Sequence, residues 1–199
     1  MLNNDILRRL RYTLNLSDNE MIAMFASANR AVSRQQVSAW LKKEGTAGFA
    51  ECTDRTLAIF LNGLINEKRG KREGIQPNPE NKLNNNIIFK KLRIAFNLKD
   101  DDILAMLEDA GLKISKHELS AFFRAPEHRQ SRQCKDQVLR NFLQGLQNKY
   151  HVESEAKEKN KPKTLSKPQI KNNVKMQPKQ DEPRKTLSLN KTKFVWKEK

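Results

Sequence analysis

The chain has few of the residues that carry chemistry in enzymes and metalloproteins. Its 199 residues include 2 cysteines and 3 histidines, and the histidines (His117, His128 and His151) have no partners at metal-ligand spacing. The sequence contains no HExxH or CxxC motif, no Walker loop and no glycine-rich dinucleotide fingerprint. We therefore expect no enzymatic activity, no bound metal and no cofactor.

Long apolar runs are also missing. No segment approaches the ~20 apolar residues that a transmembrane helix requires, so we expect no membrane span. The opening MLNNDILRRLRYTLNL is amphipathic and arginine-rich, as transit peptides are. It contains Asp5, however, and its pattern recurs at residue 85, so we do not expect a cleavable transit peptide. Two cysteines without a secretory signal favour the reducing cytoplasm as the location of the protein.

Acidic residues are outnumbered by basic ones. The chain has 39 Lys and Arg against 23 Asp and Glu, which gives a net charge of +16. The net charge is +3 over residues 1–70, +1 over 71–83, +4 over 84–152 and +8 over 153–199, so half of it lies in the last segment. A basic tail on mildly basic domains is typical of proteins that bind RNA, DNA or an anionic surface.

The sequence is internally duplicated. When the chain is shifted by 82 residues, residues 3–66 align with residues 85–148 without a gap, and 22 of the 64 positions are identical. The identical pairs include Asn3/Asn85, Asn4/Asn86, Arg11/Arg93, Asp18/Asp100, Cys52/Cys134, Asp54/Asp136 and Gly63/Gly145. A gapless match of this length indicates two repeats of one domain.

Both repeats predict the same helices. Apolar residues at helical spacing predict a first helix over about residues 4–14 and a second over about residues 18–28, each with a counterpart in the second repeat. Ser17, Ser33 and Ser115 each precede Glu or Gln by three residues, which is the capping-box pattern at the start of a helix. No stretch alternates with period two, so we expect no sheet.

The predicted fold is all-α, with two tandem copies of a small four-helix domain followed by a disordered basic tail. The domains are expected at residues 1–69 and 84–152, the linker at 70–83 and the tail at 153–199. The second and third helices of each repeat weakly resemble a helix-turn-helix, although their connection is longer than the usual turn. The last residues, TLSLNKTKFVWKEK, are interpreted either as a docking motif for a protein partner or as a frayed end.

Three pairs of identical residues have a structural and a functional interpretation. Cys52 and Cys134 are buried small side chains, or else a disulfide or regulatory thiol pair. Asp54 and Asp136 are predicted N-caps of the fourth helix rather than acid–base catalysts. Arg11, with its counterpart in the second repeat, is either an ion-pair partner of an aspartate or an exposed binding residue.

Basic residues recur at equivalent positions of the two repeats. The first helix is positive in both repeats, and so is the exposed face of the third helix, after which His128, Arg129 and Arg132 follow in the second repeat. For any single cluster a solvated helix face is the simpler interpretation, but the repetition and the basic tail favour phosphate binding. The candidate nucleic-acid-binding residues are Arg8, Arg9, Arg11, Arg34, Lys42, Lys90, Lys91, Arg93, Lys116 and Arg124.

Three segments carry a family resemblance. NNDILRRLRYTLNLSD, SRQQVSAWLKKEG and FLNGLI together resemble the YehS-like family of bacterial proteins, over approximately residues 1–150. The resemblance implies a bacterial cytoplasmic protein with a duplicated helical domain of unassigned function, and it implies no catalytic residues. The segment after residue 152 departs from the family pattern as an extension.

Two functional hypotheses follow from the sequence. The first is binding of RNA or non-specific DNA, with phosphates contacted by the basic helices and attracted by the tail. The second is a bivalent adaptor for protein partners, in which the C-terminal tail supplies a docking segment.

Overall fold

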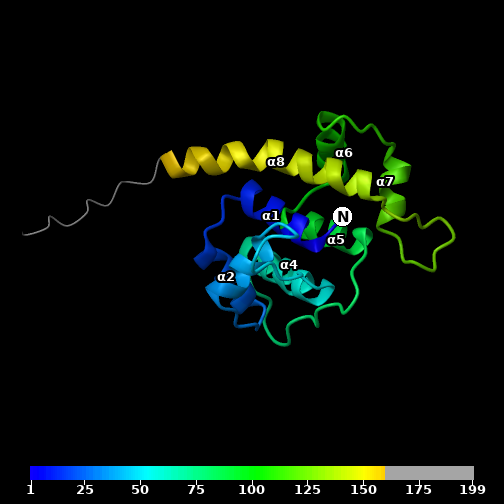
Figure 1. Cartoon of the computed structure of the whole chain (residues 1–199). Helices are drawn as coiled ribbons and strands as arrows, with labels where there is room; N and C mark the ends of the chain where they lie inside the picture. Colours follow the sequence, from blue (N-terminus) through cyan, green and yellow to red (C-terminus); the bar gives the residue numbers. More distant parts are fainter. Residues whose placement is uncertain (160–199) are drawn as a thin grey trace, which may run out of the picture. The chain divides into compact units, whose positions relative to one another are not determined.

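The computed structural model describes residues 1–159, with side chains to His151, and this part of the chain contains α-helices and no strands (Figure 1). The first repeat contains α1 (Asn3–Thr13), α2 (Asp18–Ser27), α3 (Arg34–Leu41) and α4 (Asp54–Arg69). The second repeat contains α5 (Asn85–Ala95), α6 (Asp100–Asp109), α7 (Lys116–Phe122) and α8 (Asp136–Lys159). The predicted all-α fold with a duplicated four-helix unit is therefore confirmed.

The helix starts follow from local side-chain chemistry. Ser17, Ser33 and Ser115 each accept a hydrogen bond from the backbone of the residue three positions on, whose own side chain bonds back, so all three predicted capping boxes are present. The prediction for the fourth helix is corrected. The N-cap of α4 is Thr53, whose hydroxyl accepts from the Thr56 amide, and Asp54 is the first helical residue.

The connection between the second and third helices also follows a local rule. It contains Asn29 (φ 60°) in the first repeat and Gly111 (φ 81°) in the second, both in the left-handed region. Glycine and asparagine are the residues that adopt this conformation most readily. The replacement of glycine by asparagine in the first repeat therefore leaves the turn unchanged.

Glycine has a second use inside the helices. A Cβ atom added at Gly63 would lie 1.9 Å from the backbone oxygen of Met24, and one added at Gly145 would lie 2.4 Å from that of Met106. These approaches are far closer than van der Waals contact. Gly63 and Gly145 therefore let α4 pack directly on the backbone of α2, and α8 on that of α6.

The first helices of the two repeats are exchanged. α1 packs more extensively on α8 than on α4 of its own repeat, and α5 packs more extensively on α4 than on α8 (Figure 1). The buried side chains of both repeats consequently form one hydrophobic cluster. The described residues 1–159 thus belong to a single compact unit in which each repeat completes the other.

Polar contacts follow the same exchange. The backbone amide of Leu83 donates to Asp54 (2.9 Å), and the amino group of Met1, at the equivalent position, donates to Asp136 in the other repeat. The linker takes part as well, because Glu80 pairs with Lys91 (3.0 Å). The linker is therefore more than the exposed connection that its composition predicts.

The last helix extends past the predicted end of the second repeat. α8 continues to Lys159, beyond the predicted start of the tail at residue 153. The remaining tail, with its predicted disorder and docking motif, lies outside the described residues. None of the helices in residues 1–159 combines the length and the apolar composition that a membrane crossing requires.

Candidate nucleic-acid interface

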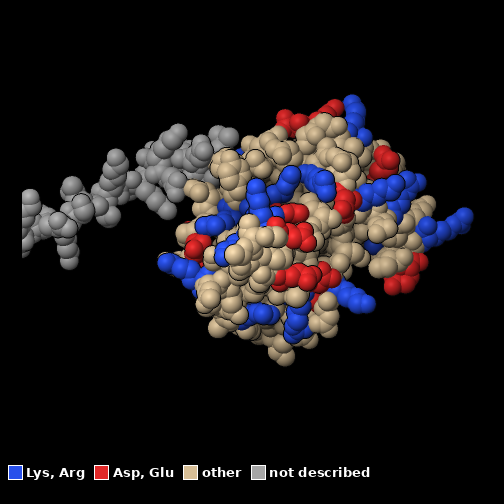
Figure 2. All heavy atoms as spheres, in the orientation of Figure 1, with Lys and Arg blue, Asp and Glu red and all other residues tan. Residues whose placement is uncertain are grey.

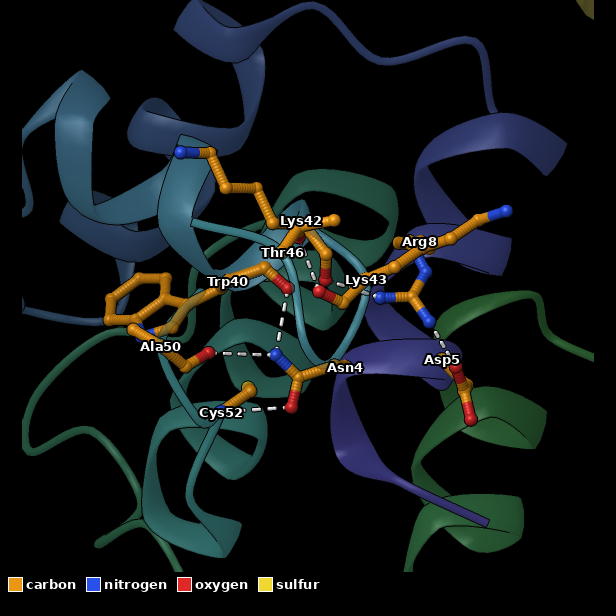
Figure 3. Close-up of polar contacts among 9 residues, drawn as sticks. All are labelled: Asn4, Asp5, Arg8, Trp40, Lys42, Lys43, Thr46, Ala50 and Cys52. Atoms are coloured by element: carbon orange, nitrogen blue, oxygen red, sulfur yellow. Dashed lines mark hydrogen bonds and ion pairs between the residues drawn. The ribbon is translucent and has the colours of Figure 1, made fainter. Parts of the chain in front are cut away.

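The loops between the third and fourth helices are held by an asparagine on the first helix. The Asn4 amide donates to the backbone oxygens of Trp40 (2.8 Å) and Ala50 (2.9 Å), and its oxygen accepts from the Cys52 amide (3.0 Å), as Figure 3 shows. In the second repeat Asn86 makes the same three bonds, to Phe122, Arg132 and Cys134. Both loops therefore have the same anchor, although Gly45 and Gly48 give the first loop a different backbone conformation.

The cysteines at these anchors are structural. Both are buried and free, which agrees with their interpretation as small core residues and not with a disulfide between them. Burial raises the pKa of the Cys52 thiol to about 12, and burial likewise raises that of Cys134 to about 12. A thiol with so high a pKa is a poor nucleophile at neutral pH.

Half of the candidate nucleic-acid-binding residues form salt bridges with carboxylates. Arg11 pairs with Asp18 (2.9 Å), and Arg93 pairs with Asp100 (2.8 Å) and also lies 4.6 Å from the centre of the Phe123 ring. The remaining paired residues are Arg8, paired with Asp5, Lys91, paired with Glu80, and Lys116, paired with Asp101. The ion-pair interpretation of Arg11 and Arg93 is confirmed.

Lys91 is buried and does not belong to the candidate interface. Its side chain is almost fully buried, at 9% exposure, between α5, α4 and the linker. Its ammonium group donates to the Asn62 side chain (2.6 Å) in addition to its pair with Glu80. Adjacent residues of an α-helix point about 100° apart, so Lys90 is exposed while Lys91 is buried at the contact of α5 with α4. Lys91 therefore joins the repeats and is not available to phosphate.

Three other candidates bond to backbone or amide oxygens. Arg9 reaches the backbone oxygen of Arg140 (3.5 Å), and Arg34 reaches the Asn19 side chain (3.0 Å). Lys42 donates to the backbone oxygen of Ala47 (2.7 Å), which folds this lysine over its own loop. Arg8 donates to the Lys42 oxygen in turn, as shown in Figure 3. These hydrogen bonds hold the side chains of the four cations against the protein surface.

The last two candidates, Lys90 and Arg124, line a hollowed surface around the loop between α7 and α8, where Arg124 also donates to the side chains of Gln130 and Ser120. One hollow, of about 450 Å³, is lined by His117, Arg124, Arg129 and Arg132 together with Glu118 and Ser131. A second hollow, of about 510 Å³, shares Arg124, Ser131 and Arg132 with the first and adds Lys90 and several apolar residues. We call the set Lys90, His117, Arg124, Arg129 and Arg132 the α7–α8 basic face.

The cations of the α7–α8 basic face outnumber the carboxylates that line the two hollows, although Glu118 interacts electrostatically with Arg132. Within residues 1–151, no salt bridge is formed by Lys90, Arg124, Arg129 or Arg132. Glu118, the carboxylate in the first hollow, is bonded to Ser115, and these bonds lower the pKa of Glu118. In Figure 2 a group of basic side chains lies over the α7 side at the right of the view, whereas basic and acidic side chains alternate near the centre. The face is therefore a local excess of positive charge.

The equivalent loop of the first repeat differs in charge. Arg129 and Arg132 correspond to Ala47 and Ala50, and Arg124 corresponds to Lys42. Over the whole loop, residues 124–133 contain three arginines and one glutamate, whereas residues 42–51 contain two lysines and two glutamates. The second repeat alone has this strongly basic loop.

The set of candidates derived from the sequence therefore included two residues of this face and left three out. His117, Arg129 and Arg132 have no basic counterpart in the first repeat, where Gln35, Ala47 and Ala50 stand, so the repetition of basic residues does not identify them. The signal that identifies them is the opposite one, a difference in charge between two loops with the same anchor. Within the described residues, no group of three or more His, Cys, Asp or Glu side chains is arranged to hold a metal ion.

Comparison with known proteins agrees with the duplication. The model of the family described as "Protein of unknown function (DUF1456)" matches the chain twice, over residues 3–70 and 85–151. The "Uncharacterized protein YehS" of Escherichia coli (strain K12) is 49% identical over 153 residues, which cover 76% of this chain and 98% of that relative. No solved structure matches the chain.

Proposed function

We propose that this chain, which belongs to the DUF1456 family of proteins of unknown function, binds RNA or non-specific DNA through its second repeat. The resemblance to the YehS-like family that three sequence segments predicted is confirmed, and it assigns no role. The observation that supports the proposal is the α7–α8 basic face, with cations that outnumber the carboxylates around two joined hollows. A cytoplasmic location, where RNA and DNA are available in a bacterium, is part of the proposal.

Phosphate chemistry explains why such a face suits a nucleic acid. Arginine offers a planar fork of donors that matches two phosphate oxygens, and three arginines surround one hollow here. Binding would release condensed counterions, so affinity should fall steeply with salt. The tail after residue 161, with its basic sequence, would increase the rate of encounter through long-range attraction.

The adaptor hypothesis receives less support. A bivalent adaptor needs two modules that can reach two sites independently. The exchange of α1 and α5 joins the repeats into one compact unit, so they do not form separate modules. A protein partner of the tail remains a separate prediction, since that segment lies outside the described residues.

The first test compares nucleic-acid binding by the full chain and by residues 1–161. Fluorescence anisotropy of labelled RNA and DNA oligomers would be measured over a series of salt concentrations. Retained, salt-dependent binding by residues 1–161 supports the repeats as the binding module. Complete loss of binding when the tail is removed would overturn the proposal and make the tail a general polyanion tether.

A variant then locates the interface. Arg129→Ala with Arg132→Ala gives the second loop the residues that the first loop already has, so the fold should tolerate both changes. We expect weaker binding and a salt slope that is smaller by about 1–2, because each lost phosphate contact reduces the slope by about 1. The control is Lys43→Ala with Lys68→Ala, which removes the same charge from exposed positions of the first repeat. Equal effects of the two double variants would contradict a localised interface.

A further inference from the structure

The second hollow of the α7–α8 basic face is half apolar. Besides Lys90, Arg124 and Arg132, its lining includes Ile87, Phe123, Ala125 and Pro126. Its volume of about 510 Å³ is within the range of small-molecule pockets, roughly 300–1,000 Å³. Phosphate binding alone does not call for an apolar wall next to the cations. A ligand with an anionic part and a flat apolar part would use both.

Phe123 is placed as an aromatic platform in this hollow. Its ring is half-buried against the core, with an edge contact to Phe89 (5.1 Å between ring centres) and the Arg93 guanidinium over one face (4.6 Å from the ring centre), so a base can contact only the part of the ring that lines the hollow. The corresponding residue of the first repeat is Leu41. The aromatic ring and the arginines thus distinguish the second repeat from the first at the same place.

Polar groups complete the hollow. Gln133 and Asn84 also line it. An amide can donate to and accept from the edge of a base, although the Asn84 oxygen already accepts from the Ile87 amide (2.9 Å) as the N-cap of α5. Arg124 and Arg132 belong to both hollows, so a phosphate held by these arginines is adjacent to the apolar wall. A nucleotide has this combination of an anionic phosphate and a planar base with a polar edge.

We infer, resting on the proposed function, that this face binds single-stranded nucleic acid and receives one unstacked base against Phe123. The arginine-rich hollow holds the adjacent phosphate. A duplex keeps its bases inside the stack and can offer only phosphates to the arginines, so it binds less tightly. The structure thereby favours a single strand over a duplex of the same sequence.

Two variants of the full-length protein test the base site. Phe123→Leu introduces the residue of the first repeat and removes the aromatic platform, and Ala125→Leu narrows the hollow from an exposed position. We expect each to weaken binding of a labelled ten-nucleotide single-stranded RNA by about tenfold, since stacking one base on an aromatic ring accounts for an effect of this size. Affinity for a duplex of the same length should change by less than about twofold. The control is Phe49→Leu, the same change at a partly exposed phenylalanine of the first loop.

The outcomes separate this inference from the proposed function. If Arg129→Ala with Arg132→Ala weakens both ligands while Phe123→Leu and Ala125→Leu leave the single strand unaffected, the basic interface stands and the base site is refuted. Equal losses for single strand and duplex in Phe123→Leu and Ala125→Leu would also refute it. If the double arginine variant binds as tightly as the unchanged protein, the proposed function itself fails.

Discussion

Asn4 uses its side-chain amide almost fully, because both amide hydrogens and the oxygen bond to the backbone of one loop. Asn4→Asp keeps the shape but replaces the two donors by an oxygen that faces two carbonyl oxygens. We expect a loss of about 3 kcal/mol in the free energy of unfolding, since a buried group left unsatisfied costs about 1–3 kcal/mol. Urea unfolding followed by circular dichroism measures it.

A matched control for this substitution exists on the surface. Asn19 is exposed and accepts from Arg34, and its counterpart in the second repeat is already an aspartate, Asp101, paired with Lys116. Asn19→Asp should therefore change stability by less than about 0.5 kcal/mol. A loss at Asn4 no greater than at Asn19 would show that the anchor does not hold the loop.

The two thiols give a prediction that depends on pH. With a pKa of about 12, roughly one thiol in ten thousand is ionised at pH 8, and both groups are buried. Native protein should therefore react with a thiol reagent far more slowly than protein in urea. Because burial raises the folded pKa above the ordinary thiol value of about 9, the neutral thiols stabilise the fold fully below about pH 9, and this contribution decreases as the pH rises towards 12. Rapid labelling of both cysteines at pH 8 in native buffer would contradict their burial.

At the scale of helices, a close interhelix contact in each repeat depends on a glycine. Gly63→Ala places a methyl group against the Met24 oxygen, so α2 must move away from α4. We expect a destabilisation of about 3 kcal/mol, at the upper end for overpacking. Thermal unfolding measures the effect, with Lys68→Ala on the exposed side of α4 as the control. A Gly63→Ala protein as stable as that control would show that the two helices are not in direct contact.

The helices themselves were largely predictable from the sequence. The apolar spacing and the capping boxes at Ser17, Ser33 and Ser115 depend on residues within about one helical turn, and the structure contains all three capping boxes. The error at Asp54 has a local reason, since Thr53 and Asp54 are both good capping residues and the cap is the one whose side chain reaches the Thr56 amide. The end of α8 was missed because its last residues are polar and have no apolar stripe to mark a helix.

At the scale of the whole molecule, the exchange of the first helices was not predictable. An amphipathic stripe shows that a helix buries one face, but both repeats offer α1 an equivalent partner, α4 or α8. The choice depends on the linker and on contacts such as that of Lys91, which join residues distant in sequence. The position of the α7–α8 basic face was missed for a related reason, because its residues come from two helices and a loop.

The exchange predicts how the protein behaves when it is divided. Residues 1–78 and 79–161, cut within the exposed part of the linker, should each fail to form a folded monomer, because each lacks the partner of its first helix. Mixed in equal amounts, they should form a helical 1:1 complex with one cooperative unfolding transition. Circular dichroism with analytical ultracentrifugation distinguishes these states. A folded, monomeric residue 1–78 fragment would contradict the exchange.

The covalent connection between the repeats has a further consequence. Two separate chains, each with one repeat, could pair by the same exchange, but every substitution would then appear on both sides of the dimer. In a single chain, arginines can be present in the second loop alone, while the first loop keeps alanines at the equivalent positions and the shared core is unchanged. Fusion thus frees one loop to acquire a ligand while the other continues to serve the fold.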